Sequence, residues 1–147
     1  LTIKPLKALC YRFLKEVQVD ASQNIILFPA IDARRDEIFT QEFSLALNAK
    51  SAMQPTVVDE HFFEQFAPAQ IALFGDGAAK FEKWFSKHEQ VKLYPHIIAS
   101  AQYNAIEALE KFNKKDFADL AYFEPSYGKE FQTTTSTKLS NVRKHIL

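Results

Sequence analysis

Several residue types that mark special sites are scarce in this sequence. Of its 147 residues, three are glycine, one is methionine and one, Cys10, is cysteine. A lone cysteine excludes an internal disulfide and agrees with a reducing cytoplasm. No apolar run approaches the roughly 20 residues that a membrane-spanning helix needs, and no secretory signal is visible. We therefore expect a cytoplasmic protein that does not enter the membrane.

The sequence also lacks an excess of either charge. Lysine and arginine together number 18, as do aspartate and glutamate, so the formal net charge is zero. Such a chain has no overall attraction for phosphate backbones, which disfavours a protein that binds nucleic acid on its own. Two small basic groups are interpreted as the end of a helix and a solvated tail: Lys111, Lys114 and Lys115, and Arg143, Lys144 and His145.

Apolar side chains, in contrast, are abundant. Hydrophobic residues make up 47% of the chain, and 14 residues are phenylalanine. This composition indicates a packed globular fold rather than a disordered one, and the length fits a single domain. We expect that domain to span residues 1–139, with a tail at residues 140–147.

Apolar periodicity predicts an alternation of helices and strands. A helix with one buried face, which carries Leu6, Cys10 and Phe13, is predicted between about residues 4 and 16. Extended patterns predict five strands, at residues 25–32, 38–47, 52–58, 70–74 and 91–94. Further helices are expected near residues 62–66, after Gly77 and after Ser100.

Two of these elements have individual features. Pro29 lacks a backbone N–H, which predicts a bulge or an unpaired edge in the first strand. The last helix gathers apolar residues on one face, namely Ala105, Ile106, Leu109 and Phe112.

The order of the elements predicts an α/β fold with a mixed sheet flanked by helices. Three consecutive strands should form an antiparallel meander, and the strand at residues 70–74 should return through a helical crossover to lie parallel to it. This is the arrangement of ribonuclease-H-like domains, including each half of the actin-like ATPases. A fold of this kind does not by itself specify a function.

The most distinctive segment is the turn at residues 31–39, Ile-Asp-Ala-Arg-Arg-Asp-Glu-Ile-Phe. It places five charged residues between two predicted strands, and composition alone favours a solvated hairpin tip. The carboxylates of Asp32 and Glu37 can accept backbone N–H groups across the turn, and Asp32 can also pair with Arg34.

A second turn follows the strand at residues 70–74. Gly75 and Gly77 allow a sharp change from strand to helix. A strand, a glycine-containing turn and a helix N-terminus also suit a phosphate group. The pattern lacks the lysine or threonine that follows the glycines in nucleotide-binding loops.

These segments resemble landmarks of the TsaB (YeaZ) family. Residues 31–39 resemble its Ile-Asp-Ala-Arg-x-x-Glu-Val-Tyr turn, residues 73–77 its strand ending in Gly-x-Gly, and residues 123–127 its Glu-Pro-x-Tyr sequence. In the last of these, the matching residues are Glu124, Pro125 and Tyr127. The opening Pro-Leu-Lys-Ala-Leu at residues 5–9 is similar to the helix that follows the family's first domain. The resemblance covers about residues 3–139.

The resemblance implies a non-catalytic partner subunit. Proteins of this family help to make threonylcarbamoyladenosine in tRNA, together with a threonylcarbamoyl-transferring subunit (TsaD) and a small ATPase (TsaE). Contact with tRNA would come only through that complex. The family's N-terminal half is missing here, so we expect this chain to be the C-terminal half of a longer protein. We expect no cofactor or metal in this half, although the full complex can use a nucleotide.

The sequence departs from the family near its end. The family's Tyr-Leu-Arg is replaced by Tyr127-Gly128-Lys129, and its basic and aromatic tail by a run of threonine and serine at residues 133–137. These replacements weaken the argument that the tail has a binding role.

Other classes of function are tested against the same residues. A metallopeptidase needs clustered histidine and carboxylate ligands, and the four histidines are too dispersed. A serine hydrolase of the Gly-x-Ser-x-Gly type has no matching sequence. An ATP site of the actin-like fold lies between two halves, of which one half supplies at most a part. A generic ribonuclease-H-like module that binds a protein or a small ligand stays open as the alternative.

Overall fold

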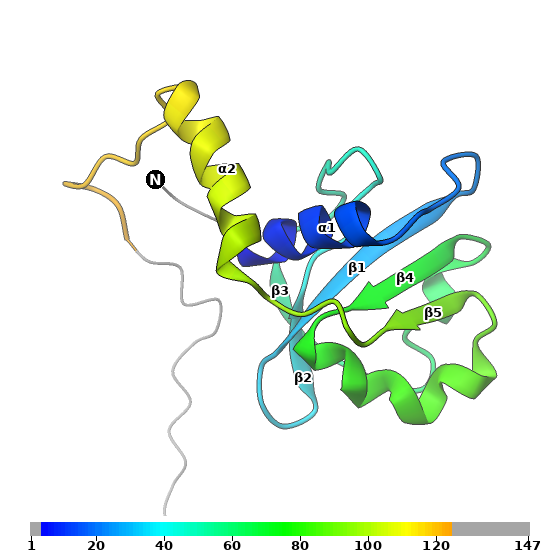
Figure 1. The fold of residues 1–147 in the computed structure, drawn as a ribbon. Helices are drawn as coiled ribbons and strands as arrows, with labels where there is room; N and C mark the ends of the chain where they lie inside the picture. Colours follow the sequence, from blue (N-terminus) through cyan, green and yellow to red (C-terminus); the bar gives the residue numbers. More distant parts are fainter. Residues whose placement is uncertain (1–3, 125–147) are drawn as a thin grey trace, which may run out of the picture.

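The computed structural model describes residues 4–124, except for the side chains of residues 85–87. Its elements follow one another in the order shown in Figure 1. There are two α-helices, α1 (Pro5–Glu16) and α2 (Ala101–Asn113), and two 3₁₀ helices, η1 (Glu64–Phe66) and η2 (Asp76–Lys87). The strands are β1 (Ile25–Asp32), β2 (Glu37–Thr40), β3 (Gln54–Val57), β4 (Gln70–Phe74) and β5 (Val91–Tyr94).

The strands form one mixed sheet in the order β3-β2-β1-β4-β5. β1 pairs antiparallel with β2 and parallel with β4, and β5 pairs parallel with β4. In the central pairing, Ile25 lies opposite Gln70 and Pro29 lies opposite Phe74. The predicted antiparallel meander and parallel return are therefore confirmed, and with them the mixed α/β class.

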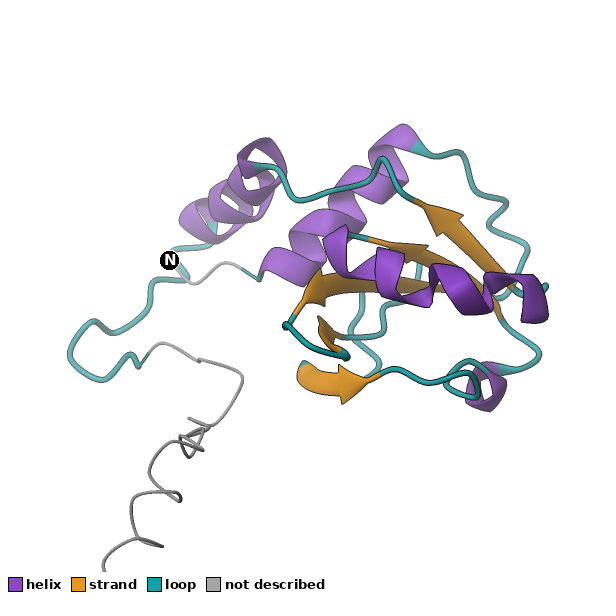
Figure 2. Cartoon of the chain, turned by 90° about the horizontal axis from the view of Figure 1, so that it is seen from below, coloured by secondary structure: helices purple, strands orange, loops and turns teal. Residues whose placement is uncertain are grey.

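Helices cover both faces of the sheet (Figure 2). Successive residues of a strand point to opposite faces, so Phe28 and Leu73 contribute to one core while Leu27 and Phe74 contribute to the other. The first core also contains Phe81 from η2. The second is closed by the apolar face of α1, which buries Leu6, Leu9, Cys10 and Phe13 as the sequence predicts.

The predicted strand at residues 38–47 is wrong in length. β2 ends at Thr40, and the following residues form a loop that touches β1 only through a bridge between Phe43 and Leu27. Pro29 lies in the gap between that bridge and the first regular pair, Ala30 with Thr40. The break that Pro29 predicts is therefore present, and its carbonyl accepts a hydrogen bond from the Thr40 hydroxyl at 2.8 Å.

Two helices also differ from the prediction. The helix expected near residues 62–66 is a single 3₁₀ turn, which Pro68 limits. In α2, the apolar residues Ile106, Leu109 and Phe112 are exposed, whereas Tyr103 and Glu107 are buried. Among the helices of residues 4–124, none is long and apolar enough to cross a membrane.

The buried cysteine gives a test of this packing. Cys10 has no exposed surface, and burial raises the pKa of its thiol well above the ordinary range. Because the thiolate is the reactive form, we expect a thiol reagent such as DTNB to react with native protein no faster than the protein unfolds. Reaction followed across a urea series should accelerate in parallel with the loss of far-ultraviolet circular dichroism. Rapid reaction of fully native protein would contradict this placement of α1.

Candidate functional site

The turn between β1 and β2 has a strained backbone. Arg34 and Arg35 both have positive φ, at 66° and 50°, a conformation that costs non-glycine residues about 1–2 kcal/mol each. Two consecutive left-handed residues fit the right-handed twist of a hairpin. The turn is closed by two backbone hydrogen bonds, from Ala33 N to the Glu37 carbonyl at 3.1 Å and from Glu37 N to the Arg34 carbonyl at 3.2 Å.

The carboxylate of Asp32 holds this turn in place. Its Oδ1 accepts the backbone N–H of Arg34 at 2.7 Å and forms an ion pair with Lys80 Nζ. The ammonium of Lys80, followed by the Arg34 N–H, lowers the pKa of Asp32 below its usual value. Lys80 also donates to the Glu37 carbonyl at 2.6 Å. One lysine thus connects both strands of the hairpin to η2.

The two glycines let η2 begin close to this turn. A Cβ atom on Gly75 would lie 2.1 Å from the Ala30 carbonyl oxygen, and the φ of Gly75 is +103°. A Cβ atom on Gly77 would lie 2.9 Å from the carbonyl carbon of Ile31 and 3.0 Å from Asp32 N. The space beside each glycine is therefore filled by β1. Phosphate binding at Gly75 and Gly77 stays a prediction, and the structure gives these glycines a packing role.

Among the predicted site residues, Asp32, Arg34 and Glu37 lie together with the glycine turn. Lys80, which connects these two segments, was missed because only the tertiary structure places η2 against the hairpin. Glu124 is exposed and lies beyond α2. Pro125, Tyr127 and the basic group at residues 143–145 lie outside the described residues.

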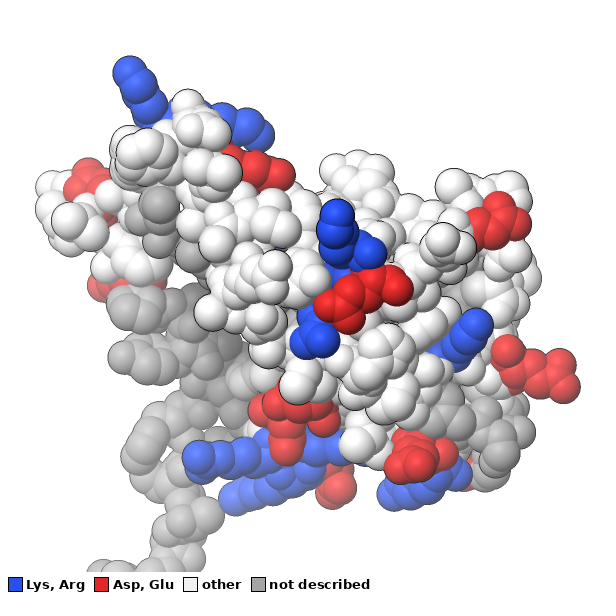
Figure 3. Space-filling view, viewed as in Figure 1, with Lys and Arg blue, Asp and Glu red and all other residues white. Residues whose placement is uncertain are grey.

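The charges and cavities near the turn do not indicate a large ligand. Figure 3 shows acidic and basic side chains interspersed on one face of the molecule rather than a field of one sign. A crevice of about 200 Å³ lies beside Gly75 and Asp76, bounded by Leu93 of β5 and by Pro95 just after that strand. No group of three or more histidine, cysteine or carboxylate side chains within the described part of the chain could hold a metal ion.

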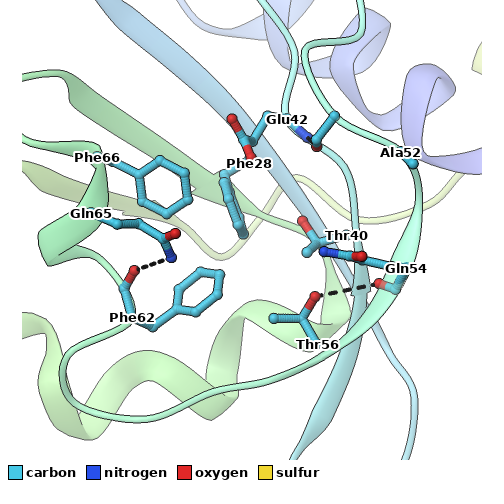
Figure 4. Close-up of a pocket in the computed structure, with 10 residues that line it drawn as sticks. Phe28, Thr40, Glu42, Ala52, Gln54, Thr56, Phe62, Gln65 and Phe66 are labelled. Atoms are coloured by element: carbon cyan, nitrogen blue, oxygen red, sulfur yellow. Dashed lines mark hydrogen bonds between the residues drawn. The ribbon is translucent and has the colours of Figure 1, made fainter.

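A smaller cavity lies away from the turn, between the sheet and η1 (Figure 4). It measures about 70 Å³ and is lined by Phe28, Phe62 and Phe66 on one side and by polar residues that include Thr40 and Gln54 on the other. Phe28 packs edge-on against Phe62 and Phe66 at centroid distances of 5.5 Å. Its size admits a few water molecules but no nucleotide.

Replacing Gly75 by alanine tests the close approach of η2 to β1. We expect a loss of about 3 kcal/mol in the free energy of unfolding, because the added Cβ meets the Ala30 carbonyl and the backbone φ is positive. Urea denaturation measures this loss. Ala79→Ser, at an exposed position of the same helix, serves as the control and should leave the midpoint unchanged. Equal midpoints for both variants would show that the two turns are not in contact.

We predict that the Asp32–Lys80 ion pair makes a small, pH-dependent contribution to the free energy of unfolding. Since folding lowers the pKa of Asp32, its stabilising effect is present above about pH 4 and lost as the pH falls through the folded pKa. The Asp32 side chain is 49% exposed. The free energy of unfolding of the wild type should therefore exceed that of Asp32→Asn by less than about 1 kcal/mol at pH 7. This difference should shrink towards pH 2.

Chemical denaturation from pH 7 to pH 2 measures this difference. Lys80→Met should also lower the free energy of unfolding at pH 7, because it removes both the partner of Asp32 and the donor to the Glu37 carbonyl. Lys50→Met, at an exposed position, is the matched control. A stability difference between wild type and Asp32→Asn that grows on acidification would refute the assigned pairing.

Comparison with known proteins gives a likeness of structure. No protein-family model matches the sequence, and no curated protein matches it. A solved structure described as an uncharacterized protein with similarity to peptidase YeaZ from Pseudomonas aeruginosa superposes over 88% of this chain with a TM-score of 0.63 and 16% identity. YeaZ from Pseudomonas aeruginosa superposes over 86% with a TM-score of 0.59, also at 16% identity.

The chain spans 58% of the length of each of these solved chains. At such identity, the comparison describes the fold rather than the chemistry. The five-stranded mixed sheet with helices on both faces is a YeaZ-like fold.

Proposed function

We propose that this chain is the C-terminal part of a non-catalytic partner subunit for the threonylcarbamoylation of tRNA. In this proposal it works with a threonylcarbamoyl-transferring subunit and a small ATPase, and tRNA is contacted only through the complex. The YeaZ-like fold over 88% of the chain carries the proposal. The Asp-Ala-Arg turn of the sequence adds to it, because the structure places that turn at an exposed, braced hairpin.

The chemistry of the turn supports a binding role rather than a catalytic one. A general base works best when its pKa lies near the working pH, whereas the Asp32 carboxylate is held ionised by Lys80 and by the N–H of Arg34. The one cysteine is buried and has a raised pKa. The rigid feature that the turn offers to another molecule is its outer surface, where Arg34, Arg35 and Asp36 are exposed.

A module that binds a small ligand is the alternative within the same fold. The observation that favours it is the 200 Å³ crevice at Gly75 and Asp76, which lies at the carboxyl ends of two parallel strands, where open α/β sheets commonly bind ligands. Such a module would not be needed for the modification of tRNA.

Reconstitution separates these two functions. The full-length protein is combined with its cognate transferase and ATPase, ATP, threonine, bicarbonate and unmodified tRNA, and the nucleosides are analysed by mass spectrometry. We expect threonylcarbamoyladenosine only when this protein is present. Partners that reach their full rate without it, and that are competent with another YeaZ protein, would exclude the role in tRNA modification.

The contribution of the turn is tested in the same assay. We expect Asp32→Ala combined with Glu37→Ala to lower the rate of modification several-fold, because the hairpin loses its brace and part of its surface. Asp20→Ala removes a carboxylate from a different exposed turn, where it binds Ser22, and should leave the rate unchanged. A folded double variant with the normal rate would exclude the turn from partner binding.

A further inference from the structure

Exposed apolar side chains are concentrated in one stretch of the chain, on α2 and the segments on either side of it. Ten large hydrophobic residues are exposed in the described part of the chain, and eight of them lie between residues 98 and 123. Surface hydrophobic residues of a monomer are usually scattered, and a contiguous group marks an interaction site. The eight are Ile98, Ile106, Leu109, Phe112, Phe117, Leu120, Tyr122 and Phe123.

The centre of this group lies on α2. Ile106, Leu109 and Phe112 follow one another at intervals of three residues, which places them on one side of the helix. Leu109 is 61% exposed and Phe112 is 60% exposed. Phe112 also packs edge-on against Phe117, with ring centroids 6.0 Å apart. We call these four residues the apolar ridge.

Polar contacts prevent α2 from turning the ridge inward. The Tyr11 hydroxyl of α1 donates to Glu110 Oε1 at 2.8 Å, and the Tyr103 hydroxyl donates to Glu16 Oε1 at 2.9 Å. Glu107 is 2% exposed, and its Oε2 accepts the backbone N–H of Lys4 at 2.9 Å. Rotation of α2 would break all three bonds and leave a buried carboxylate without its partner. The outward position of the ridge is therefore built into the packing of α2 on α1.

The same contacts place the start of α1 beside the ridge-bearing helix. Because Lys4 N is bound to Glu107 in the middle of α2, chain that precedes residue 4 joins the domain at α2. Figure 1 shows α2 projecting away from the sheet, and the hydrogen bonds of Tyr11 and Tyr103 join one side of α2 to α1. A domain joined to the beginning of this chain would thus be held next to the ridge, at high effective concentration.

We propose that the apolar ridge is the docking surface for a preceding domain of the same polypeptide, which would cover it with an apolar face of its own. The proposal rests on the proposed function, in which this chain is the C-terminal part of a longer subunit. The superposed YeaZ structures are longer than this chain, which spans 58% of their length, and so leave room for such a domain.

The charges around the ridge define the occupant further. The end of α2, next to Phe112, carries three lysines, Lys111, Lys114 and Lys115. Lys111 forms a long ion pair with Asp116, with 3.7 Å between Nζ and Oδ2. The docking face should therefore be apolar at its centre and acidic at the edge that meets these lysines.

The test compares one pair of substitutions in two lengths of the protein. Leu109→Lys with Phe112→Lys is made in the 147-residue chain and in the full-length protein read from the gene. In the short chain we expect the melting temperature to stay within about 1 °C, because both side chains are already exposed. In the full-length protein we expect it to fall by about 5 °C or more, with faster proteolysis between the two parts.

Val57→Lys is the matched control, since Val57 is also 61% exposed but lies on β3. It should have no effect in either length. A full-length protein in which the ridge variant is as stable and as protease-resistant as the wild type would overturn the proposal. If modification of tRNA still depends on that protein, the proposed function stands without the docking surface.

Two other occupants would also overturn the proposal. If a second copy covers the ridge, the mass of the short chain will double as its concentration rises, and the ridge variant will prevent this doubling. If residues 125–147 cover the ridge, cutting the chain after Glu124 will increase the binding of an apolar dye. A gene with no domain before this chain would refute the part of the proposed function on which the inference rests, before any variant is compared.

Discussion

The close approach of the glycine turn to the end of β1 is the constraint on which the arrangement around the turn depends. Gly75 and Gly77 bring η2 to within contact of the backbone of Ala30 and Ile31, and only residues without a Cβ atom permit this distance. Lys80 can then reach both Asp32 and the Glu37 carbonyl. With a bulkier turn, η2 would move outward, and the hairpin with two left-handed arginines would lose its brace.

Packing and polarity divide the molecule into two regions of different character. Around the sheet, apolar side chains are buried in two cores, and the polar contacts serve to fix turns. Between α1 and α2 this relation is reversed, since hydrogen bonds to Glu107 and Glu110 join the helices while apolar side chains remain in solvent. Burial raises the pKa of Tyr11 to about 12, with a further contribution from Glu110. The Tyr11 hydroxyl therefore stays protonated, and able to donate to Glu110, across the physiological pH range.

Local pattern predicted the sheet well, because alternation and breaker residues act within a few positions. β1, β4 and β5 were located correctly, and Pro29 predicted the interruption beside β1. The end of β2 at Thr40 was not predictable from alternation, which continues to Leu47 without a partner strand. Lys80 was missed for a related reason: its partners lie more than 40 positions away. The orientation of α2 was hidden because its side facing α1 is polar.

The register of the central strands has a consequence for how the chain folds. β1 and β2 are close in sequence and can pair early, whereas Ile25 pairs with Gln70, which lies 45 positions further along the chain, so this non-local pairing is expected to form later. Until then, β1 presents an apolar edge to other chains, a recognised route to aggregation. Pro29, which cannot donate a hydrogen bond from its nitrogen, interrupts the other edge of β1, which faces β2, because the backbone groups of Leu27 and Pro29 both point to that side. The same proline that shortens the native ladder with β2 thus leaves the edge that waits for β4 continuous, so pairing with β4 is what covers that edge.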